Sequence, residues 1–142
     1  MRTVRQLLET KTHEVYSVTP GDSVITAIKL MAEKGVGAVL VMQGGQLAGI
    51  VSERDYARKV VLHGKSSSDT PARDIMTADV VTVGPNHTVE RCMQIVTEHR
   101  IRHLPVVEDG QVIGVISIGD LVKAVIEDQQ LELDQLQRYI AS

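Results

Sequence analysis

Residues 46–55, QLAGIVSERD, recur as residues 111–120, QVIGVISIGD, at an offset of 65 positions. The offset holds without gaps from residues 15–60 to residues 80–125, and 12 of the 46 aligned pairs are identical. A fixed internal offset is typical of a repeated supersecondary unit. One such unit buries too little apolar surface to be stable alone. We therefore expect the two copies to pack about a pseudo-twofold axis, which leaves two related clefts along their interface.

Both copies predict the element order β-α-β-β-α, so the expected fold class is α/β of the α+β kind. The first strand is expected at residues 15–18 in one copy and 80–83 in the other. Ser23 and Thr88 then lie at the predicted N-cap positions of the two helices, and both are residue types that cap helices.

Two β-rich runs follow each helix and are joined by a turn dipeptide. The dipeptide is Gly44-Gly45 in the first copy and Asp109-Gly110 in the second. Both dipeptides accept the positive φ angles of a tight hairpin turn, so each pair of runs predicts a hairpin.

The repeats set the expected domain boundaries. We expect the first repeat to occupy residues 1–65, with a short N-terminal helix at residues 3–9, and the second to occupy residues 66–142. Residues 63–73 are rich in Ser, Lys and Asp, which is typical of a solvated connector.

The last segment predicts an extended C-terminal helix over residues 118–140. Its seam residues are spaced 4-3-4-3-4, as in paired helices: Val122, Ile126, Gln129, Leu133, Leu136 and Ile140. This row either covers the flank of its own domain or forms a dimer seam.

Composition excludes several function classes. Aromatic residues make up 2% of the chain and the net charge is -3, so the stacking platforms and basic surface of a nucleic-acid-binding protein are missing. The single cysteine, Cys92, cannot form an internal disulfide, and it is spaced along the helix as a small core residue. No apolar run approaches the ~20 residues that span a bilayer, and no histidine spacing predicts a zinc site. We expect a cytoplasmic protein that binds neither membrane nor metal.

The candidate site residues begin with two copies of the pattern Gly-x-x-Ser-x-x-Asp, at 49–55 and 114–120. Each copy lies where a strand passes into a helix. One interpretation is a capping box, in which the Ser and Asp side chains satisfy backbone N–H groups. The other is that the Asp accepts hydrogen bonds from the vicinal hydroxyls of a ribose, while the Ser and the helix start face phosphate.

A second candidate is the stretch 101–105, Ile-Arg-His-Leu-Pro, at the entry to a β-run. Charged side chains beside an apolar strand are costly to bury without a partner. Arg102 and His103 therefore either meet an anion or lie exposed at the start of the strand. Pro105 fits the end or the edge of a sheet.

These motifs, with Asp-Ile-Met-Thr at 74–77, resemble the tandem cystathionine β-synthase (CBS) domain pair, or Bateman module. The phrases VSERDY at 51–56 and IRHLP at 101–105 are most similar to stand-alone CBS-pair proteins of bacteria and plant organelles.

The resemblance implies a sensor without catalysis that binds adenosyl ligands in the clefts between the repeats. The expected ligand is AMP, with NAD or ATP as alternatives and no metal required. The resemblance also implies a homodimer and a regulated protein partner. The nucleotide-binding residues it implies are Val36, Gly37, Ala38, Ser52, Arg54, Asp55, Ile101, Arg102, His103, Leu104, Pro105, Ser117, Ile118 and Asp120.

The two implied sites differ in charge. Gly37-Ala38 in the first copy matches Arg102-His103 in the second, and Arg54 matches Gly119. Two other functions stay open: a constitutive dimerisation adaptor in which the Ser-x-x-Asp motifs are only caps, and a nucleotide-modifying enzyme with His103 as base.

Overall fold

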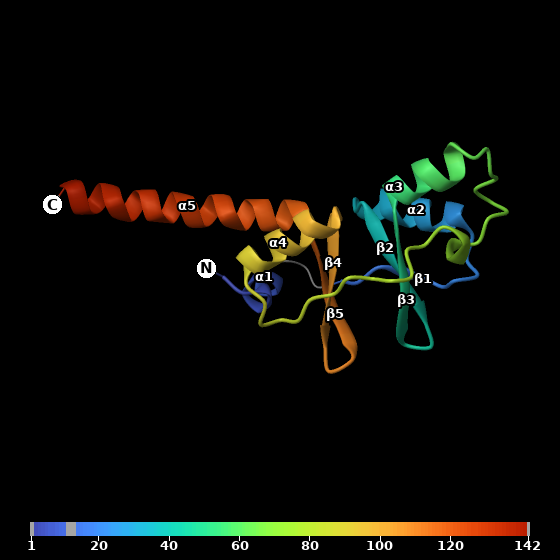
Figure 1. Ribbon diagram of the computed structural model, residues 1–142, viewed down its shortest axis with the longest axis horizontal. Helices are drawn as coiled ribbons and strands as arrows, with labels where there is room; N and C mark the ends of the chain where they lie inside the picture. The colour runs from blue at the N-terminus through green and yellow to red at the C-terminus, as the bar shows by residue number, and fades with distance from the viewer. Residues whose placement is uncertain (1, 11–13, 142) are drawn as a thin grey trace. The chain divides into compact units, whose positions relative to one another are not determined.

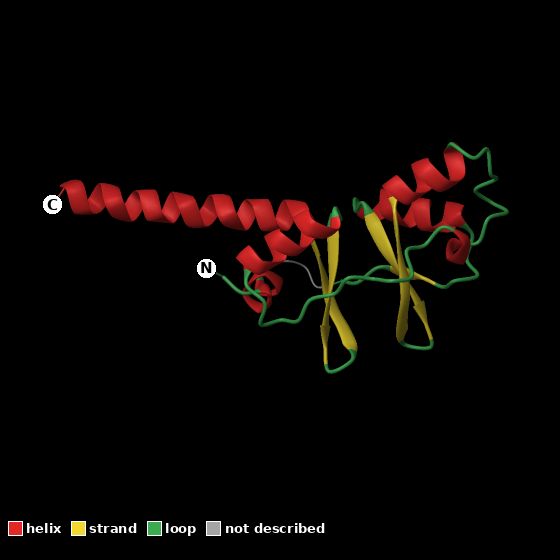
Figure 2. Cartoon of the chain, viewed as in Figure 1, coloured by secondary structure: helices red, strands yellow, loops and turns green. Residues whose placement is uncertain are grey.

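The computed structural model describes residues 2–10 and 14–141 and has mixed α+β architecture (Figures 1 and 2). This confirms the expected fold class. The chain divides into two units, one over Glu14–Val81 and one that combines Met1–His13 with Thr82–Ser142. Each unit contains one copy of the repeat.

The unit Glu14–Val81 holds a three-stranded sheet in the order β1-β2-β3, with β1 parallel to β2 and β2 antiparallel to β3. Its elements are β1 (Ser17–Val18), α2 (Val24–Lys34), β2 (Ala38–Gln43), β3 (Gln46–Ser52), α3 (Glu53–Tyr56), a π-helical turn (Ala57–Val61) and a 3-10 turn (Ala72–Asp74). Its core is aliphatic, and its buried side chains include Val18, Val24, Ala27, Met31, Val39, Val41 and Val51.

The other unit repeats this arrangement around the antiparallel pair β4 and β5. Its elements are α1 (Val4–Glu9), α4 (Val89–His99), β4 (His103–Glu108), β5 (Gln111–Ser117) and α5 (Ile118–Ala141). Its buried side chains include Val4, Val83, Val89, Cys92, Val96, Leu104, Val106, Ile116 and Leu121.

The strand expected at residues 80–83 is reduced to one parallel bridge at Val83. In the first repeat, the Leu40 N–H donates to the Tyr16 carbonyl at 3.0 Å. Pro105 takes the place of Leu40 at the offset of 65 and has no N–H to donate. This ladder bond cannot form in the second repeat, so the strand there stops short.

Both predicted hairpin turns are confirmed by their backbone angles. Gly44 and Gly45 have φ of 58° and 79°, and Asp109 and Gly110 have φ of 52° and 77°. Positive φ at both central residues is what a type I′ hairpin turn requires.

The predicted N-caps are confirmed as well. The Ser23 hydroxyl accepts the Thr26 N–H at 3.4 Å, and the Thr88 hydroxyl accepts the Arg91 N–H at 3.1 Å. Each bond satisfies one of the N–H groups that a helix start leaves without an intrahelical partner.

Helix α1 (Val4–Glu9) lies where the sequence predicts it, but it packs on the second repeat and not on the first. The Val4 N–H donates to the His87 carbonyl at 2.9 Å. In the structure the N-terminal segment groups with the second repeat, where its apolar side chains are buried, whereas the expected division into residues 1–65 and 66–142 places it with the first.

The connector at residues 63–73 is also more than a solvated link. Thr70 and Ala72 are buried. The Thr70 carbonyl accepts the Val24 N–H at 2.8 Å, so the connector supplies a partner to the first N–H of α2. Its polar composition reflects hydrogen bonds to the fold as well as contact with water.

Two glycines allow these segments to approach the sheets closely. A Cβ added to Gly49 would lie 2.6 Å from Met76 Sδ and 2.9 Å from the Thr77 carbonyl oxygen. A Cβ added to Gly114 would lie 2.7 Å from Leu8 Cδ2. Glycine is needed at both places because a side chain would occupy the space of its neighbour.

The C-terminal helix is confirmed as α5, and it extends past the rest of its own unit (Figure 1). Leu121 and Ala124 near its start are buried, whereas Leu133 and Leu136 near its end are exposed. Only the first part of the helix is covered by its own unit.

We expect Gly49→Ala to lower the free energy of unfolding by about 1–3 kcal/mol, because the added methyl group meets backbone as well as side chain. Gly114→Ala should cost less, since its nearest contacts are the movable tip of Leu8. Gly21→Ala is the matched control, because its Cβ would meet only Arg73 Nη1 at 3.8 Å. Urea unfolding measures all three, and equal losses for Gly49→Ala and Gly21→Ala would contradict the close approach.

Candidate functional site

The first Gly-x-x-Ser-x-x-Asp motif forms a capping box at the junction of β3 and α3. The Ser52 N–H and hydroxyl both donate to Asp55 Oδ2, at 2.9 and 3.0 Å, and the Asp55 N–H donates back to Ser52 Oγ at 3.1 Å. The Glu53 N–H donates to the Gly37 carbonyl at 3.0 Å. This bond holds the residue before β2 beside the motif.

The second motif repeats this geometry at the junction of β5 and α5. The Ser117 N–H donates to Asp120 Oδ2 at 2.8 Å, and the Asp120 N–H donates to Ser117 Oγ at 3.1 Å. The Ile118 N–H donates to the Arg102 carbonyl at 2.8 Å, and His103 pairs with Ser117 in the ladder. Arg102 and His103 therefore lie beside the motif of their own repeat.

The caps explain both Asp residues structurally. A carboxylate has about four lone-pair sites, and the cap bonds of Asp55 and Asp120 are made to one oxygen, Oδ2.

The other predicted residues differ in exposure. Arg54, Arg102 and Ile118 are exposed, and Leu104 and Pro105 are buried. The half-buried residues are Val36, Gly37, Ala38, Ile101 and His103. Leu104 and Pro105 thus belong to the core around β4, and the others line the surface near the motifs.

Lys59 is a site residue that sequence reasoning missed. Its Nζ lies 3.2 Å from Asp55 Oδ1 and donates to the Ile75 carbonyl at 2.8 Å. The spacing of four residues from Asp55 is the signal that could have identified it, because such pairs meet on a helix face. Its counterpart in the second repeat is Ala124.

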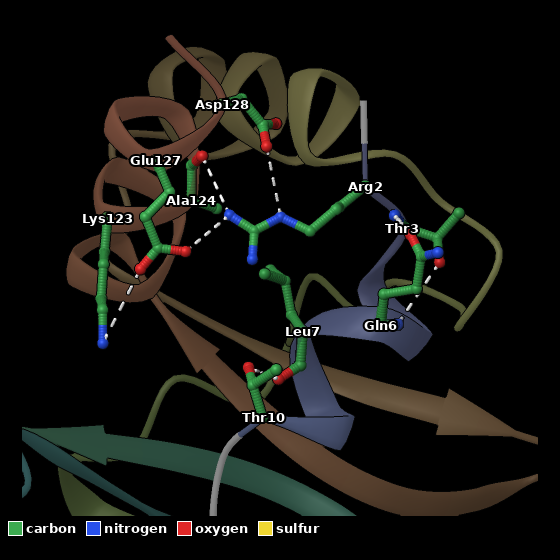
Figure 3. A network of polar contacts seen from close by, with 9 residues as sticks. All are labelled: Arg2, Thr3, Gln6, Leu7, Thr10, Lys123, Ala124, Glu127 and Asp128. Carbon is green, nitrogen blue, oxygen red and sulfur yellow. Dashed lines mark hydrogen bonds and ion pairs between the residues drawn. The ribbon is translucent and has the colours of Figure 1, made fainter. Parts of the chain in front are cut away.

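The second repeat has a cavity of about 330 Å³ at its motif carboxylate. The lining residues come from α1, the chain on either side of it, β5 and α5: Arg2, Leu7, Leu8, Thr10, Ile116, Asp120, Lys123, Ala124 and Glu127. Several of them are drawn in Figure 3. Sequence reasoning missed the N-terminal members, because no spacing rule connects residues more than a hundred positions apart.

Arg2 ties the N-terminal segment to α5 at the edge of this cavity. Its guanidinium donates to the Ala124 carbonyl and to Glu127 Oε2, both at 3.0 Å, and its Nε lies 3.4 Å from Asp128 Oδ1 (Figure 3). The start of the chain is therefore held against its last helix.

Within residues 2–10 and 14–141, no three His, Cys, Asp or Glu side chains gather closely enough to hold a metal ion. In the same ranges, no helix is long and apolar enough to cross a bilayer. His13, one of the histidines considered for a zinc site, lies outside the described residues.

Comparison with known proteins identifies the fold family. The family model for the CBS domain matches residues 4–62 and again residues 72–127. The chain belongs to the CBS domain family.

Three similar proteins show how this CBS protein relates to other members of the family. A solved CBS-domain protein from Burkholderia ambifaria MC40-6 is 56% identical, with a TM-score of 0.87 over 90% of this chain and 96% of that one. The mitochondrial CBS domain-containing protein CBSX3 of Arabidopsis thaliana is 46% identical over 127 residues, which are 86% of this chain and 62% of that protein. This chain thus spans less than two thirds of that relative.

The third relative was solved with a ligand. It is the CBS domain protein PAE2072 from Pyrobaculum aerophilum complexed with AMP, 26% identical, with a TM-score of 0.75. The match covers 84% of this chain and 89% of that one.

Cys92 of the CBS protein is a core residue, as its helical spacing predicts. It is 0% exposed on α4. Burial raises the pKa of its thiol, and the charge of Arg91 opposes this with a smaller effect. The thiolate is the reactive form of cysteine. The native thiol is therefore protected because it is buried and because its pKa is raised.

We expect Cys92 to react with a thiol-specific disulfide reagent at least tenfold more slowly in the native protein than in urea. The raised pKa also means that the unfolded state loses its thiol proton first, so stability should fall as pH rises above the unfolded value of ~8.5. Stopped-flow absorbance measures the labelling rate, and native labelling as fast as in urea would contradict the burial.

Proposed function

We propose that this CBS protein is a regulatory module that binds an adenosyl ligand and has no catalytic activity of its own. AMP is the first candidate, and ATP and NAD are the alternatives. The observation that carries the proposal is the position of Asp120 at the wall of a cavity with apolar sides. Membership of the CBS family and the AMP complex of the Pyrobaculum relative support the same ligand class.

The residues around Asp120 suit the three parts of an adenine nucleotide. Leu7, Leu8 and Ile116 offer an apolar surface for the adenine ring. The Asp120 carboxylate suits two vicinal ribose hydroxyls, because charged acceptors make the stronger hydrogen bonds. Lys123, together with Arg102 beside the motif, supplies positive charge for phosphate, and His103 lies next to Arg102.

Asp55 and Ser52 are the corresponding groups in the first repeat, with Val36, Gly37, Ala38 and Arg54 as their neighbours. In the second repeat the proposed set includes Ser117, Ile118, Ile101, Leu104 and Pro105. The burial of Leu104 and Pro105 assigns these two to the support of β4.

Regulation follows if the ligand prefers one conformation. A ligand shifts an equilibrium between two states only by its difference in affinity for them. We propose that binding selects one arrangement of the homodimer, which a partner protein reads. A reducing cytoplasm is the proposed compartment.

The alternative is a constitutive dimerisation adaptor. The capping boxes favour it, because they account for both Asp residues without any ligand. The two functions differ in one observable, the response of stability to adenosyl ligands.

The first experiment is a thermal-shift panel of AMP, ADP, ATP, NAD, NADH and S-adenosylmethionine on protein freed of co-purified nucleotide. A ligand at a hundred times its Kd stabilises the native state by about 2.7 kcal/mol, so the Tm should rise by several degrees. Asp120→Ala should lower the unliganded Tm through loss of the cap and should abolish most of the rise.

Thr88→Ala is the matched control for that variant. It removes a helix cap in the same unit, the bond from the Arg91 N–H at 3.1 Å, and should keep the full ligand-induced rise. No rise with any ligand would favour the adaptor, and a full rise in Asp120→Ala would restrict Asp120 to capping.

The homodimer forms through α5 in this proposal. Every seam residue is exposed: Val122, Ile126, Gln129, Leu133, Leu136 and Ile140. An apolar row at heptad spacing suits a second copy of the same helix, and its burial there would remove these side chains from water.

We expect Leu133→Glu to weaken the dimer at least tenfold in Kd, because it places an unpaired charge in the seam. Leu131→Glu is the control, since Leu131 is 58% exposed and Leu133 52%, but only Leu133 lies in the seam. Sedimentation equilibrium measures both, and equal dissociation constants would place the dimer contact elsewhere.

A further inference from the structure

We propose that α5 forms a parallel, in-register pair with α5 of a second copy of this chain, and that Gln129 specifies this pairing. The inference rests on the proposed function in one respect, the dimer through α5. It adds the direction of the pair, its register and the residue that determines both. It is carried by the exposure of the seam residues and by their order along the helix.

The last three turns of α5 expose an apolar row. Leu133, Leu136 and Ile140 are 52%, 54% and 74% exposed, and the helix runs beyond its own unit in Figure 1. A helical segment of about 10 residues is marginal in water by itself, because most helix stability in proteins comes from packing of an apolar face. A partner that covers this row would therefore stabilise the end of α5.

The seam and the buried side of α5 point in different directions. Leu121 and Ala124 are its buried residues, and Arg2 donates to the Ala124 carbonyl at 3.0 Å. Because an α-helix turns by about 100° per residue, the seam lies about a third of a turn away from these two side chains. A second helix can therefore pack on the seam while α5 keeps its contacts with its own unit.

Gln129 interrupts the middle of the seam, in which the other five residues are Val, Ile or Leu. Its amide carries donors and an acceptor, and burying such a group without hydrogen bonds is unfavourable. A single polar residue in a seam of this kind specifies register and the number of helices at a cost in stability. The pairing that satisfies Gln129 is therefore the favoured one.

A parallel, in-register pair satisfies Gln129. Each seam residue then faces its own counterpart, so the two Gln129 amides lie opposite each other. The amide N–H of one copy can donate to the amide oxygen of the other. A shift by one heptad would instead place Gln129 against Val122 or Leu136. The amide pair therefore selects the register as well as the direction.

An antiparallel pair does not satisfy Gln129 in any register. The seam consists of two columns, which are Val122, Gln129 and Leu136, and Ile126, Leu133 and Ile140. When two such helices run in opposite directions, residues of one column face the other column. Gln129 then lies against Ile126, Leu133 or Ile140, and its amide is buried beside a hydrocarbon side chain.

Glu132 favours the same direction. It is exposed and flanks the seam. In the antiparallel register that covers the whole seam, with Val122 facing Ile140, the Glu132 carboxylates of the two copies approach each other and repel. In the parallel pair Glu132 lies near Gln137 of the second copy, which is uncharged. Like charges brought together in one arrangement disfavour it relative to the other.

The test is disulfide cross-linking of the full chain in a glutathione redox buffer. Leu136→Cys should cross-link to its own counterpart, because the parallel pair brings the two copies of this position together. Ile126→Cys and Leu136→Cys, mixed before oxidation, should form no disulfide with each other, since these positions meet only in the antiparallel pair. One variant carries heavy nitrogen, so that mass spectrometry identifies the mixed dimer. The native Cys92 is buried and does not compete.

Gln129→Leu tests the specifying role. It should tighten the dimer about tenfold in Kd, because a leucine pair replaces a desolvated amide pair. In this background the mixed disulfide of Ile126→Cys with Leu136→Cys should appear. Gln135→Leu makes the same change at an exposed position outside the seam and is the matched control. It should leave the Kd and the cross-linking pattern unchanged. Sedimentation equilibrium measures Kd, and circular dichroism checks that each variant folds.

The outcomes separate this inference from the function on which it rests. A mixed disulfide without the Leu136→Cys self-disulfide would overturn the parallel direction and leave the α5 dimer in place. Identical cross-linking in Gln129→Leu and Gln135→Leu would overturn the role of Gln129. A monomer at every concentration, or a dimer with neither disulfide, would overturn the α5 pair itself. The thermal-shift panel tests the sensor independently of these results.

Discussion

The close cover of each sheet by a distant segment is the contact on which the rest of the structure depends. Gly49 and Gly114 have no side chain, and Met76 and Leu8 pack into the space that results. This contact fixes the connector on one repeat and α1 on the other, and it places both covering segments near the motif carboxylates. The geometry of the candidate sites thus depends on two glycines whose lack of a side chain lets these segments approach the sheets.

The sequence predicted the parts of the fold that local chemistry decides. Turn dipeptides, N-cap hydroxyls and the heptad spacing of α5 depend on interactions between residues close in sequence. Such patterns can be recognised from the sequence alone. The prediction of a strand at residues 80–83 was wrong in its length. Pro105 has no N–H to donate to that segment, which is far from it in the sequence. The packing of the N-terminal segment in the unit of the second repeat joins residues that are far apart in the chain, so no local pattern in the sequence indicates it.

The residue types of the candidate site were predictable from the sequence, but the contacts that these residues make were not. Ser52, Asp55, Ser117 and Asp120 make the capping bonds of one of the two interpretations. Their second role is a separate matter, because a cap and a ribose acceptor need the same carboxylate. The difference between Lys59 and Ala124 is visible in the aligned repeats. Only the structure shows that Lys59 donates a hydrogen bond to the Ile75 carbonyl.

The hydrogen bond from Arg2 to the Ala124 carbonyl joins residues 122 positions apart. The two units therefore become able to fold at different times during translation. The unit Glu14–Val81 is continuous, so it can fold while the ribosome is still at work. Helix α1 is made first but waits for α5, an interval of roughly 6–25 s at common synthesis rates. Until the second repeat has been synthesised, Val4 and Leu8 lack their native neighbours His87 and Gly114, and the second repeat of a neighbouring chain can supply them.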